Sequence, residues 1–401
     1  MEDPGSFLRA PGSRETPALM RLPRLLYLVT EDWYFVSHRL PMARAARDAG
    51  FEVHVATRVD RHGPQIMAEG FHLHALKWRR GSTNPAGFLL AIYRIRTLYK
   101  QLAPDLVHHV AMQPSIMGSL AALGLPHVRL NAVAGFGFAF TSKTLRARLV
   151  RAALSALIRR LFNLPRSVLL VQNVDDRSDA IALGLDPGRI ALIPGSGVEV
   201  DELTPFPEPG APITAAFVGR LLADKGLHAL MAAQELLTRR GRPVRLLLAG
   251  EPDPANPASI PPTTIELWRQ RPGVVMLGHV PDIRTVWAAA HIAVLPSRRE
   301  GLPKSLLEAA ACGRPLIATD VPGCREIARD GVNAILVPVD DAPALADAID
   351  RLAGDSELRQ RYGAQARRLV ETEFSSTRIG EQIVALYRQL LGNYRGEDSW
   401  T

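Results

Sequence analysis

Cysteine is scarce in this chain, and long uninterrupted apolar runs are missing from it. Cys312 and Cys324 are the two cysteines among 401 residues. They match no zinc-ligand spacing and suggest no disulfide framework, so a reducing compartment is expected. The most apolar long stretch, residues 115–140, is interrupted by a histidine, an arginine and an asparagine, which excludes a membrane-spanning helix there. Residues 1–22 are rich in Pro, Gly and Ser and lack the apolar centre of a signal peptide, so we expect a disordered tail.

The sequence also lacks the signatures of nucleic-acid binding. It has no arginine-rich recognition helix, zinc finger or aromatic RNA-binding motif, so nucleic acid is not an expected partner. Positive charge is nevertheless concentrated in the first half. Residues 1–200 contain 25 Lys and Arg against 15 Asp and Glu, whereas residues 201–401 contain 23 against 25. A basic N-terminal half favours an anionic partner, either a phospholipid surface or a phosphate-bearing substrate.

Short apolar runs alternate with helical segments in two successive series, a pattern typical of parallel sheets covered by helices on both faces. A chain of 401 residues is also long enough for two domains. We therefore predict an α/β protein with two facing Rossmann-like, doubly wound parallel-sheet domains. The strands expected in the first series are 24–30, 52–57, 71–76, 106–110, 168–172 and 191–193, and those in the second are 215–218, 245–249, 274–277, 292–295, 316–318 and 334–337.

A proline-rich connector at residues 201–213 separates the two series. We expect an N-terminal domain over residues 23–200 and a C-terminal domain over residues 214–375. A last helix, residues 376–393, is expected to cross back onto the first domain. In doubly wound folds ligands bind outside the carboxyl ends of the strands, so the expected site is the cleft between the domains.

The strongest chemical signal is the segment LPSRREGLPKSLLEAAACGRPLIATDVPGCREI, which runs from Leu295 to Ile327. A buried strand is followed by a loop with Glu300, and a helix begins near Lys304. Such a helix start offers unpaired backbone N–H groups and the positive end of a dipole to an anion. Glu300 on the loop and Glu308 one turn into the helix suit two neutral parts of one elongated ligand, a sugar ring and a ribose diol. Taken alone, a loop acid and a solvated helical acid would give the same spacing.

A second signal is a pair of cations in AAFVGRLLADKGLHALMAA, residues 215–233. Arg220 and Lys225 lie five positions apart around a strand-to-helix turn. Two cations so placed can clamp a diphosphate and stabilise it as it departs. Without further context, cations in a loop are usually solvated.

These motifs resemble those of the large retaining glycosyltransferase family four, which has two facing Rossmann-like domains (the GT-B architecture). Its hallmark is a Glu, seven residues, Glu element in the second domain. The resemblance implies that Glu300 lies beside the donor sugar, that Glu308 binds the ribose, and that Arg220 and Lys225 bind the diphosphate. The donor-binding residues that it implies are Gly219, Arg220, Lys225, Gly250, His279, Val280, Glu300, Gly301, Leu302, Pro303 and Glu308. For His279 it implies a backbone contact with the base and no catalytic role.

The first domain lacks the glycine-rich turn that many relatives carry after the first strand, because residues 30–34 read TEDWY. The segments TEDWYFVSHRLPMARAA, PDLVHHVAMQPSIMGSLAA, NAVAGFGFAF and LLVQNVDD are similar instead to a bacterial branch of the family. That branch extends undecaprenyl-diphosphate-linked sugars, and some members transfer N-acetylgalactosamine. The resemblance places His38, Arg39, Gly135 and Gly137 on the acceptor side, although Gly135 and Gly137 could equally form a plain strand-end turn.

The same resemblance indicates His108 as a catalytic residue. On a strand, His108 and His109 point to opposite faces, so at most one of them faces the cleft. A buried, hydrogen-bonded core histidine is the alternative.

Residues 141–166 combine basic and apolar side chains at helical spacing. A basic amphipathic helix can rest on anionic lipid headgroups, as a lipid-linked acceptor would require. The alternative is an ordinary helix that packs on the sheet. We expect a cytoplasmic protein, peripheral on the inner face of the cytoplasmic membrane. The basic residues of this segment are Lys143, Arg146, Arg148, Arg151, Arg159, Arg160 and Arg166.

Together the motifs and the resemblance that they carry imply a retaining transferase. It is expected to move a sugar from a nucleotide-diphosphate sugar, UDP-linked and of the N-acetylhexosamine class, to a polyprenyl-diphosphate-linked saccharide. The predicted catalytic residues are Glu300, Arg220, Lys225 and His108. No Asp-x-Asp motif occurs, and the two cations with the helix start can stabilise the leaving diphosphate, so no metal or other cofactor is expected. The alternatives are a nucleotide-sugar epimerase of the same fold, a non-catalytic sugar-nucleotide-binding protein, and a transferase with a soluble acceptor.

Overall fold

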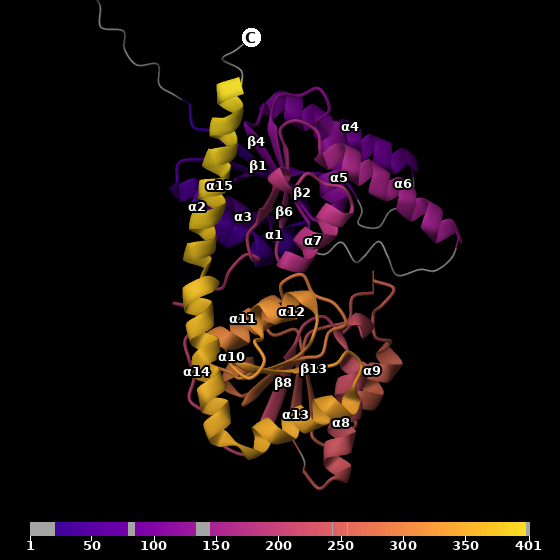
Figure 1. The fold of residues 1–401 in the computed structure, drawn as a ribbon, viewed down its shortest axis with the longest axis vertical. Helices are drawn as coiled ribbons and strands as arrows, with labels where there is room; N and C mark the ends of the chain where they lie inside the picture. Colours follow the sequence, from indigo (N-terminus) through magenta and orange to yellow (C-terminus); the bar gives the residue numbers. More distant parts are fainter. Residues whose placement is uncertain (1–20, 79–84, 134–144, 243, 255, 398–401) are drawn as a thin grey trace, which may run out of the picture.

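The computed structural model describes residues 21–78, 85–133, 145–242, 244–254 and 256–397, which form two parallel β-sheets (Figure 1). The first sheet has seven strands and the second has six. In both, the first strand of the series lies in the interior of the sheet and pairs with the second and the fourth, which is the strand order of a doubly wound fold. The predicted fold class, two Rossmann-like parallel-sheet domains, is confirmed.

Strands and helices alternate along the chain. In spatial order, the first sheet consists of β3 (His72–Ala75), β2 (Glu52–Arg58), β1 (Arg24–Glu31), β4 (Leu106–Val110), β5 (Val128–Ala132), β6 (Ser167–Val171) and β7 (Ile190–Leu192). The second consists of β10 (Val274–Gly278), β9 (Arg245–Ala249), β8 (Thr214–Val218), β11 (Ile292–Leu295), β12 (Leu316–Thr319) and β13 (Ala334–Val337).

The helices of the first series are α1 (Asp32–His38), α2 (Leu40–Asp48), α3 (Gly63–Ala68), α4 (Pro85–Leu102), α5 (Met112–Ala121), α6 (Leu145–Phe162) and α7 (Val174–Ala182). Those of the second are α8 (Leu227–Arg239), α9 (Pro262–Arg269), α10 (Ile283–Ala288), α11 (Lys304–Ala311), α12 (Pro322–Ile327), α13 (Ala342–Gly354), α14 (Ser356–Glu373) and α15 (Ser376–Glu397). Two 3-10 turns lie at η2 (Pro187–Arg189) and η3 (Ala223–Lys225).

Helices cover both faces of the first sheet, so its central strands β1, β4 and β5 are almost entirely buried. Leu25 and Tyr27 of β1 pack into a core with α1, α2 and α15. Leu26 and Leu28, which alternate with them, pack on the opposite face against α4 and α5. The buried strands of the second sheet form one larger core with α8, α11, α13 and α14.

Helix α15 follows the second sheet in the sequence but packs on the first domain, and Figure 1 shows it running alongside that domain. Ile379, Ile383 and Tyr387 are buried in the same core as β1. The Tyr387 hydroxyl oxygen also lies 2.9 Å from that of Tyr27. The two domains are therefore connected both through residues 193–213 and through α15.

Strand β5 is missing from the sequence prediction, because polar residues interrupt its apolar run. Arg129 and Asn131 alternate with apolar residues, yet both are buried. Asn131 Oδ1 accepts a hydrogen bond from Ser119 Oγ at 3.0 Å and lies 2.7 Å from His109 Nδ1. Asn131 Nδ2 donates to Ser167 Oγ at 3.1 Å. A satisfied polar network lets this strand be buried on both faces.

Helix α6 covers the first sheet with the apolar face of its last turns. Ile158, Leu161 and Phe162 are buried, whereas Arg159 and Arg160 are exposed. Over these turns the apolar side chains pack on the protein, as the alternative of an ordinary helix on the sheet predicts. Residues 141–144 lie outside the described part of the chain, as do the side chains of 145–147 and 149–151. Among the described residues, no helix is long and apolar enough to span a bilayer.

Candidate functional site

The loops that carry the strongest sequence signals follow β8 and β11, which are neighbours in the second sheet. This is the point at which the strand order reverses, where ligands of doubly wound folds bind. The loop after β8 contains Arg220 and Lys225, and the loop after β11 contains Glu300. Lys225 Nζ lies 2.5 Å from Glu300 Oε1, so two residues 75 positions apart form one ion pair.

A glycine allows these two loops to touch. Gly226 has a φ of +72°, and a Cβ at this position would lie 1.8 Å from the Pro296 carbonyl oxygen. Any side chain here would push the two loops apart. The Arg298 backbone N–H also donates to the Asp224 carbonyl at 2.8 Å. The Lys225–Gly226 turn is therefore fixed against the end of β11, which places the Lys225 ammonium at Glu300.

Glu300 is held by two donors at a single oxygen. Besides the Lys225 ammonium, Ser297 Oγ donates to Glu300 Oε1 at 2.6 Å. The Glu300 side chain is only 10% exposed, so a cation and a hydroxyl compensate for its desolvation. Ser297 was not among the predicted site residues. Its position at the end of a buried strand, three residues before Glu300, is the signal that could have indicated it.

Arg220 lies on the other side of the same turn. The preceding Gly219 packs directly on Gly250 at the end of β9, where a Cβ on Gly250 would lie 1.9 Å from the Gly219 carbonyl oxygen. The predicted pair Gly219 and Gly250 thus brings two loops into backbone contact. The Arg220 guanidinium is half-exposed and forms an ion pair with Asp253, with Nη1 2.7 Å from Oδ2.

The N-terminus of α11 faces the first domain. Pro303 precedes this helix, and no side chain caps its first turn. Its first residue, Lys304, donates from Nζ to the Ser37 carbonyl at 3.0 Å, a contact between the two domains. Lys304 Nζ also lies 3.5 Å from Glu308 Oε1. Burial raises the pKa of the Glu308 carboxyl, and the Lys304 charge opposes part of this increase.

His38, predicted on the acceptor side, lies beside the cations of the donor side. Burial is the main cause that lowers the pKa of His38 to about 3, and the charges of Arg39, Lys304 and Arg220 contribute to this decrease. Arg39 is itself buried, and its Nη1 donates to the His38 carbonyl at 3.0 Å. His38 thus follows Ser37, whose carbonyl accepts the hydrogen bond from Lys304 at the α11 start.

A cavity of about 370 Å³ lies between the domains at this position, a volume within the usual range for small-molecule sites. Lys304 and Glu308 line it, together with Ser37 from the first domain. The loop after β10 contributes residues 281–284 to the lining, which begins one residue after the predicted pair His279 and Val280. His279 itself is exposed, and Val280 packs partly on the core of the second domain.

The loop of Gly301 and Leu302 is also held by the first domain. Asn173 Nδ2 donates to the Gly301 carbonyl at 2.9 Å, while Asn173 Oδ1 accepts from the Asp176 backbone N–H at 2.7 Å as the N-cap of α7. Leu302 lies against Gly195, whose Cβ would be 2.4 Å from a Leu302 methyl carbon. Asn173 and Ser37 were not predicted, because their partners belong to the other domain.

His108 lies in the core of the first domain and not at the cleft. It is fully buried, and its Nδ1 is 2.6 Å from the Tyr387 hydroxyl of α15. His109 is equally buried and points to the opposite face, as predicted, where its Nε2 is 2.9 Å from the Tyr99 hydroxyl. Both are hydrogen-bonded core histidines, so the catalytic role expected for His108 has no support in its placement. Gly135 and Gly137 lie outside the described residues.

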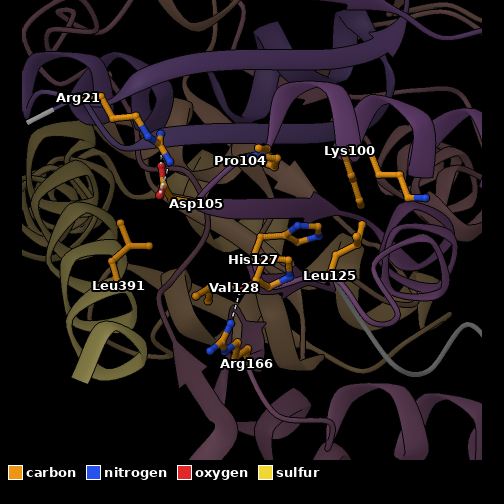
Figure 2. A pocket seen from close by; sticks show the side chains of 12 residues that line it. Arg21, Lys100, Pro104, Asp105, Leu125, His127, Val128, Arg166 and Leu391 are labelled. Carbon is orange, nitrogen blue, oxygen red and sulfur yellow. Dashed lines mark hydrogen bonds and ion pairs between the residues drawn. The ribbon is translucent and has the colours of Figure 1, made fainter. Parts of the chain in front are cut away.

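A second cavity, of about 490 Å³, lies at the opposite end of the first sheet (Figure 2). Its lining includes Asp105 and Val128, at or next to the amino ends of β4 and β5, and Leu391 of α15. Figure 2 shows Arg21 reaching Asp105 on one side of it, where the two side chains form an ion pair at 2.9 Å. Since ligands of doubly wound folds bind at the carboxyl ends of strands, the interdomain cavity is the candidate active site.

Comparisons with known proteins indicate the family to which the chain belongs. Residues 212–355 match the family model described as glycosyl transferases group 1, and residues 24–172 match the model described as glycosyl transferase 4-like. The two matches together include most of both sheets.

Individual relatives extend over different shares of the chain. The capsular polysaccharide biosynthesis glycosyltransferase CapM of Staphylococcus aureus is 32% identical over 181 residues, which are 45% of this chain and 47% of CapM, so this match spans about half of each protein. The N,N'-diacetylbacillosaminyl-diphospho-undecaprenol alpha-1,3-N-acetylgalactosaminyltransferase of Campylobacter jejuni is 25% identical over 371 residues, 88% of this chain and 96% of that enzyme.

Among solved structures, Anabaena HepE in complex with UDP and glucose has the same fold. It has a TM-score of 0.73 at 16% identity, over 91% of this chain and 99% of HepE. The family matches agree with the ion-paired loops at the switch point and with the uncapped start of α11, which faces the first domain. We conclude that the chain belongs to the two-domain, GT-B glycosyltransferases of family four.

Proposed function

We propose that this chain transfers a sugar from a nucleotide-diphosphate sugar to a saccharide acceptor with retention of anomeric configuration, in the biosynthesis of a bacterial glycan. The observation that carries this proposal is the contact of Lys225 with Glu300 beside the uncapped start of α11. A diphosphate placed there meets Lys225, Arg220 and the positive end of a helix dipole. These groups stabilise negative charge without a metal ion, so none is required for the proposed step.

In this step the bond between the anomeric carbon and the β-phosphate oxygen breaks, and the acceptor oxygen forms a bond to the same face of the sugar. The acceptor hydroxyl gives its proton to the departing phosphate oxygen. Lys225 and Arg220 stabilise the leaving nucleoside diphosphate, and Glu300 positions the sugar and stabilises the positive charge that develops on it. His108 has no part in this mechanism.

The interdomain cavity suits the nucleoside part of the donor. Glu308 lines it, and a carboxylate there can accept hydrogen bonds from a ribose diol. The loop that begins at Pro281 forms another wall, where a base would lie against the protein. Uridine is our choice of nucleoside, since HepE has the same fold and was solved with UDP.

For the acceptor we propose a polyprenyl-diphosphate-linked saccharide presented at the inner face of the cytoplasmic membrane. The name of the Campylobacter jejuni relative specifies a diphospho-undecaprenol acceptor. On the first domain, α4 exposes Leu89, Leu90 and Tyr93. Helix α5 packs between α4 and α6, and α6 adds the exposed Arg159 and Arg160. This combination of exposed apolar and basic side chains favours an anionic lipid surface.

The test of the reaction is incubation of the purified protein with UDP-N-acetylgalactosamine and related UDP-sugars, with and without a polyprenyl-diphosphate saccharide. We expect release of UDP that depends on the acceptor, and an α-linked product from an α-linked donor by NMR. Conversion of one UDP-sugar to another without acceptor would indicate the epimerase alternative. A β-linked product would contradict retention.

The membrane proposal has its own test. We expect the protein to float with vesicles that contain anionic phospholipid and to remain behind with neutral vesicles. A Leu89→Ser/Tyr93→Ser variant should lose flotation while it keeps activity on a short-chain acceptor in detergent. The matched control is Leu267→Ser on the second domain, which is exposed to 65%. Equal flotation of all three proteins would refute the proposed surface.

A further inference from the structure

One glutamate and three histidines, residue types that commonly bind metal ions, lie on one face of two neighbouring strands away from the proposed active site. Glu52 and His54 belong to β2, and His72 and His74 belong to β3. The parallel register pairs His54 with His72 and Ala56 with His74. Because side chains two positions apart share a face of a strand, all four lie on the same side of the sheet. Glu52, His54 and His72 lie at or near the amino ends of their strands, whereas the donor site lies at the carboxyl ends of strands in the second sheet.

Three of these side chains direct one ligand atom each to a common point. His54 Nε2 lies 3.3 Å from Glu52 Oε1, and His72 Nε2 lies 3.8 Å from the same oxygen. The three atoms are all within 4.8 Å of one another. Ligand atoms bound to zinc at about 2.0–2.1 Å in a tetrahedral arrangement lie about 3.3–3.4 Å apart. The three atoms therefore need to move little to bind one ion.

His54 provides an independent indication of a missing partner. Its side chain is 5% exposed, and its Nε2 is buried without a hydrogen bond, although Glu52 Oε1 is close. An unpaired buried nitrogen is costly unless something binds it.

The surrounding contacts orient these ligands as they do in metal sites. His54 Nδ1 lies 3.1 Å from His74 Nε2, so Nδ1 can donate its hydrogen while Nε2 binds an ion. Arg24 Nε donates to Glu52 Oε2 at 2.9 Å, which leaves Glu52 Oε1 for the ion. His72 is exposed to 59%, so the fourth position is open to water.

We propose that Glu52 Oε1, His54 Nε2 and His72 Nε2 bind one divalent transition-metal ion, Zn²⁺ by preference, with a water as the fourth ligand. Two imidazoles and one carboxylate are a donor set that zinc accepts in tetrahedral geometry. His74 and Arg24 act as orienting residues that do not touch the ion.

The ion joins β3 to the rest of the first sheet. β3 is a four-residue strand at the edge of the sheet, and its one neighbour in the sheet is β2. Ligands on both strands connect them across the sheet and fix their register. The site is structural, and the sugar transfer proposed above does not depend on it.

The test measures zinc binding to tag-free protein that has been treated with a chelator. Isothermal titration calorimetry gives the affinity and the number of ions bound, and the visible spectrum of the Co²⁺ form reports the geometry of the site. We expect one ion per chain and the intense absorption of tetrahedral cobalt. His72→Ala and Glu52→Gln should weaken binding at least tenfold, and His74→Ala by about 10- to 100-fold through the loss of orientation. The matched control is His228→Ala, since His228 is exposed on the second domain.

Thermal unfolding provides the second measurement. Zn²⁺ should raise the Tm of the wild type and of His228→Ala by the same amount, and that of His72→Ala by less at the same zinc concentration, because the stabilisation depends on the affinity of the folded site for the ion. His72 is exposed, so the variant should fold without metal. The proposal is overturned if the wild type binds no zinc, or if His72→Ala and Glu52→Gln bind it as tightly as the wild type does. If either outcome overturns the zinc site, acceptor-dependent UDP release by the wild type would still support the proposed sugar transfer.

Discussion

Replacement of Lys225 with methionine removes the cation that holds Glu300 and that would meet the donor diphosphate. The methionine side chain keeps most of the apolar length of lysine, so the Lys225–Gly226 turn should remain in contact with Pro296. Glu300 keeps its hydrogen bond from Ser297 Oγ at 2.6 Å but loses its charged partner at 2.5 Å. The change therefore tests electrostatics rather than folding.

The expected magnitude follows from the burial of the pair. The Lys225 side chain is 22% exposed and that of Glu300 is 10% exposed, so water screens their interaction only in part. A hydrogen bond to a charged group contributes about 1.5–3 kcal/mol. If Lys225 makes such a contact with the departing diphosphate, its loss lowers kcat/KM by about 10- to 150-fold, at about 1.4 kcal/mol per factor of ten.

The assay is a double-mutant cycle with Lys225→Met, Glu300→Gln and the double variant, measured as UDP release in the presence of acceptor. Residues in direct contact are coupled by about 0.5–3 kcal/mol, so the double variant should lose less than the sum of the single losses. Lys100→Met is the matched control, because Lys100 is exposed at the far end of the first domain. It should keep wild-type activity.

Two results would refute this reasoning. Wild-type kcat/KM in Lys225→Met would show that the ammonium contacts no donor phosphate. Strictly additive losses in the double variant would show that Lys225 and Glu300 act independently, in spite of their contact in the free protein.

Three further changes address other parts of the structure. Burial gives Glu308 a raised pKa, so the folded chain holds this proton more tightly than the unfolded chain, and the contribution of Glu308 to stability declines as pH rises through that pKa. Glu308→Gln should therefore raise the Tm measured by calorimetry at pH 7, and this gain should disappear below about pH 4. The variant should also have a higher KM for the nucleotide sugar. A lower Tm at pH 7 would contradict this prediction. Tyr387→Phe removes the contacts with Tyr27 and His108 and should cost about 1–3 kcal/mol in urea unfolding with kcat unchanged; a lower kcat at unchanged stability would return His108 to the mechanism. Asn173→Ala removes the N-cap of α7 and the hydrogen bond to the Gly301 carbonyl, so it should lower stability by about 1 kcal/mol and increase the KM for the nucleotide sugar. The control Asn163→Ala removes a hydrogen bond to the Gly184 carbonyl and should leave this KM unchanged.

Most strands of both sheets could be predicted, because strands buried on both faces are mostly apolar along their length. β4, β9, β11 and β13 begin and end at the predicted residues. β5 could not be recognised from apolar content, since its buried Asn131 and Arg129 are satisfied by partners from other elements. Polar residues are compatible with burial only when such partners exist, and the partners are distant in sequence.

The site divides in the same way. That Glu300, Lys225 and Arg220 lie at one edge of the second sheet could be predicted from sequence, because each lies in a loop between a strand and a helix and the alternation of elements fixes the position of such loops. Their roles were implied by the family resemblance. The roles of Ser37 and Asn173 could not be found, since each contacts a loop of the other domain. His108 shows the reverse case. Its strand was predicted correctly, but whether it meets the cleft or a helix depends on where α15 returns.

By itself, then, the sequence determined the local pattern: which segments form strands, which turns need glycine, and which loops carry charge at the end of a strand. These properties depend on residues near one another in the chain. The tertiary structure decided which charges become partners, which polar residues are buried with a hydrogen bond, and which side chains such as Glu52, His54 and His72 converge on one point. Such contacts join residues that are distant in sequence, and packing alone sets the distances between them.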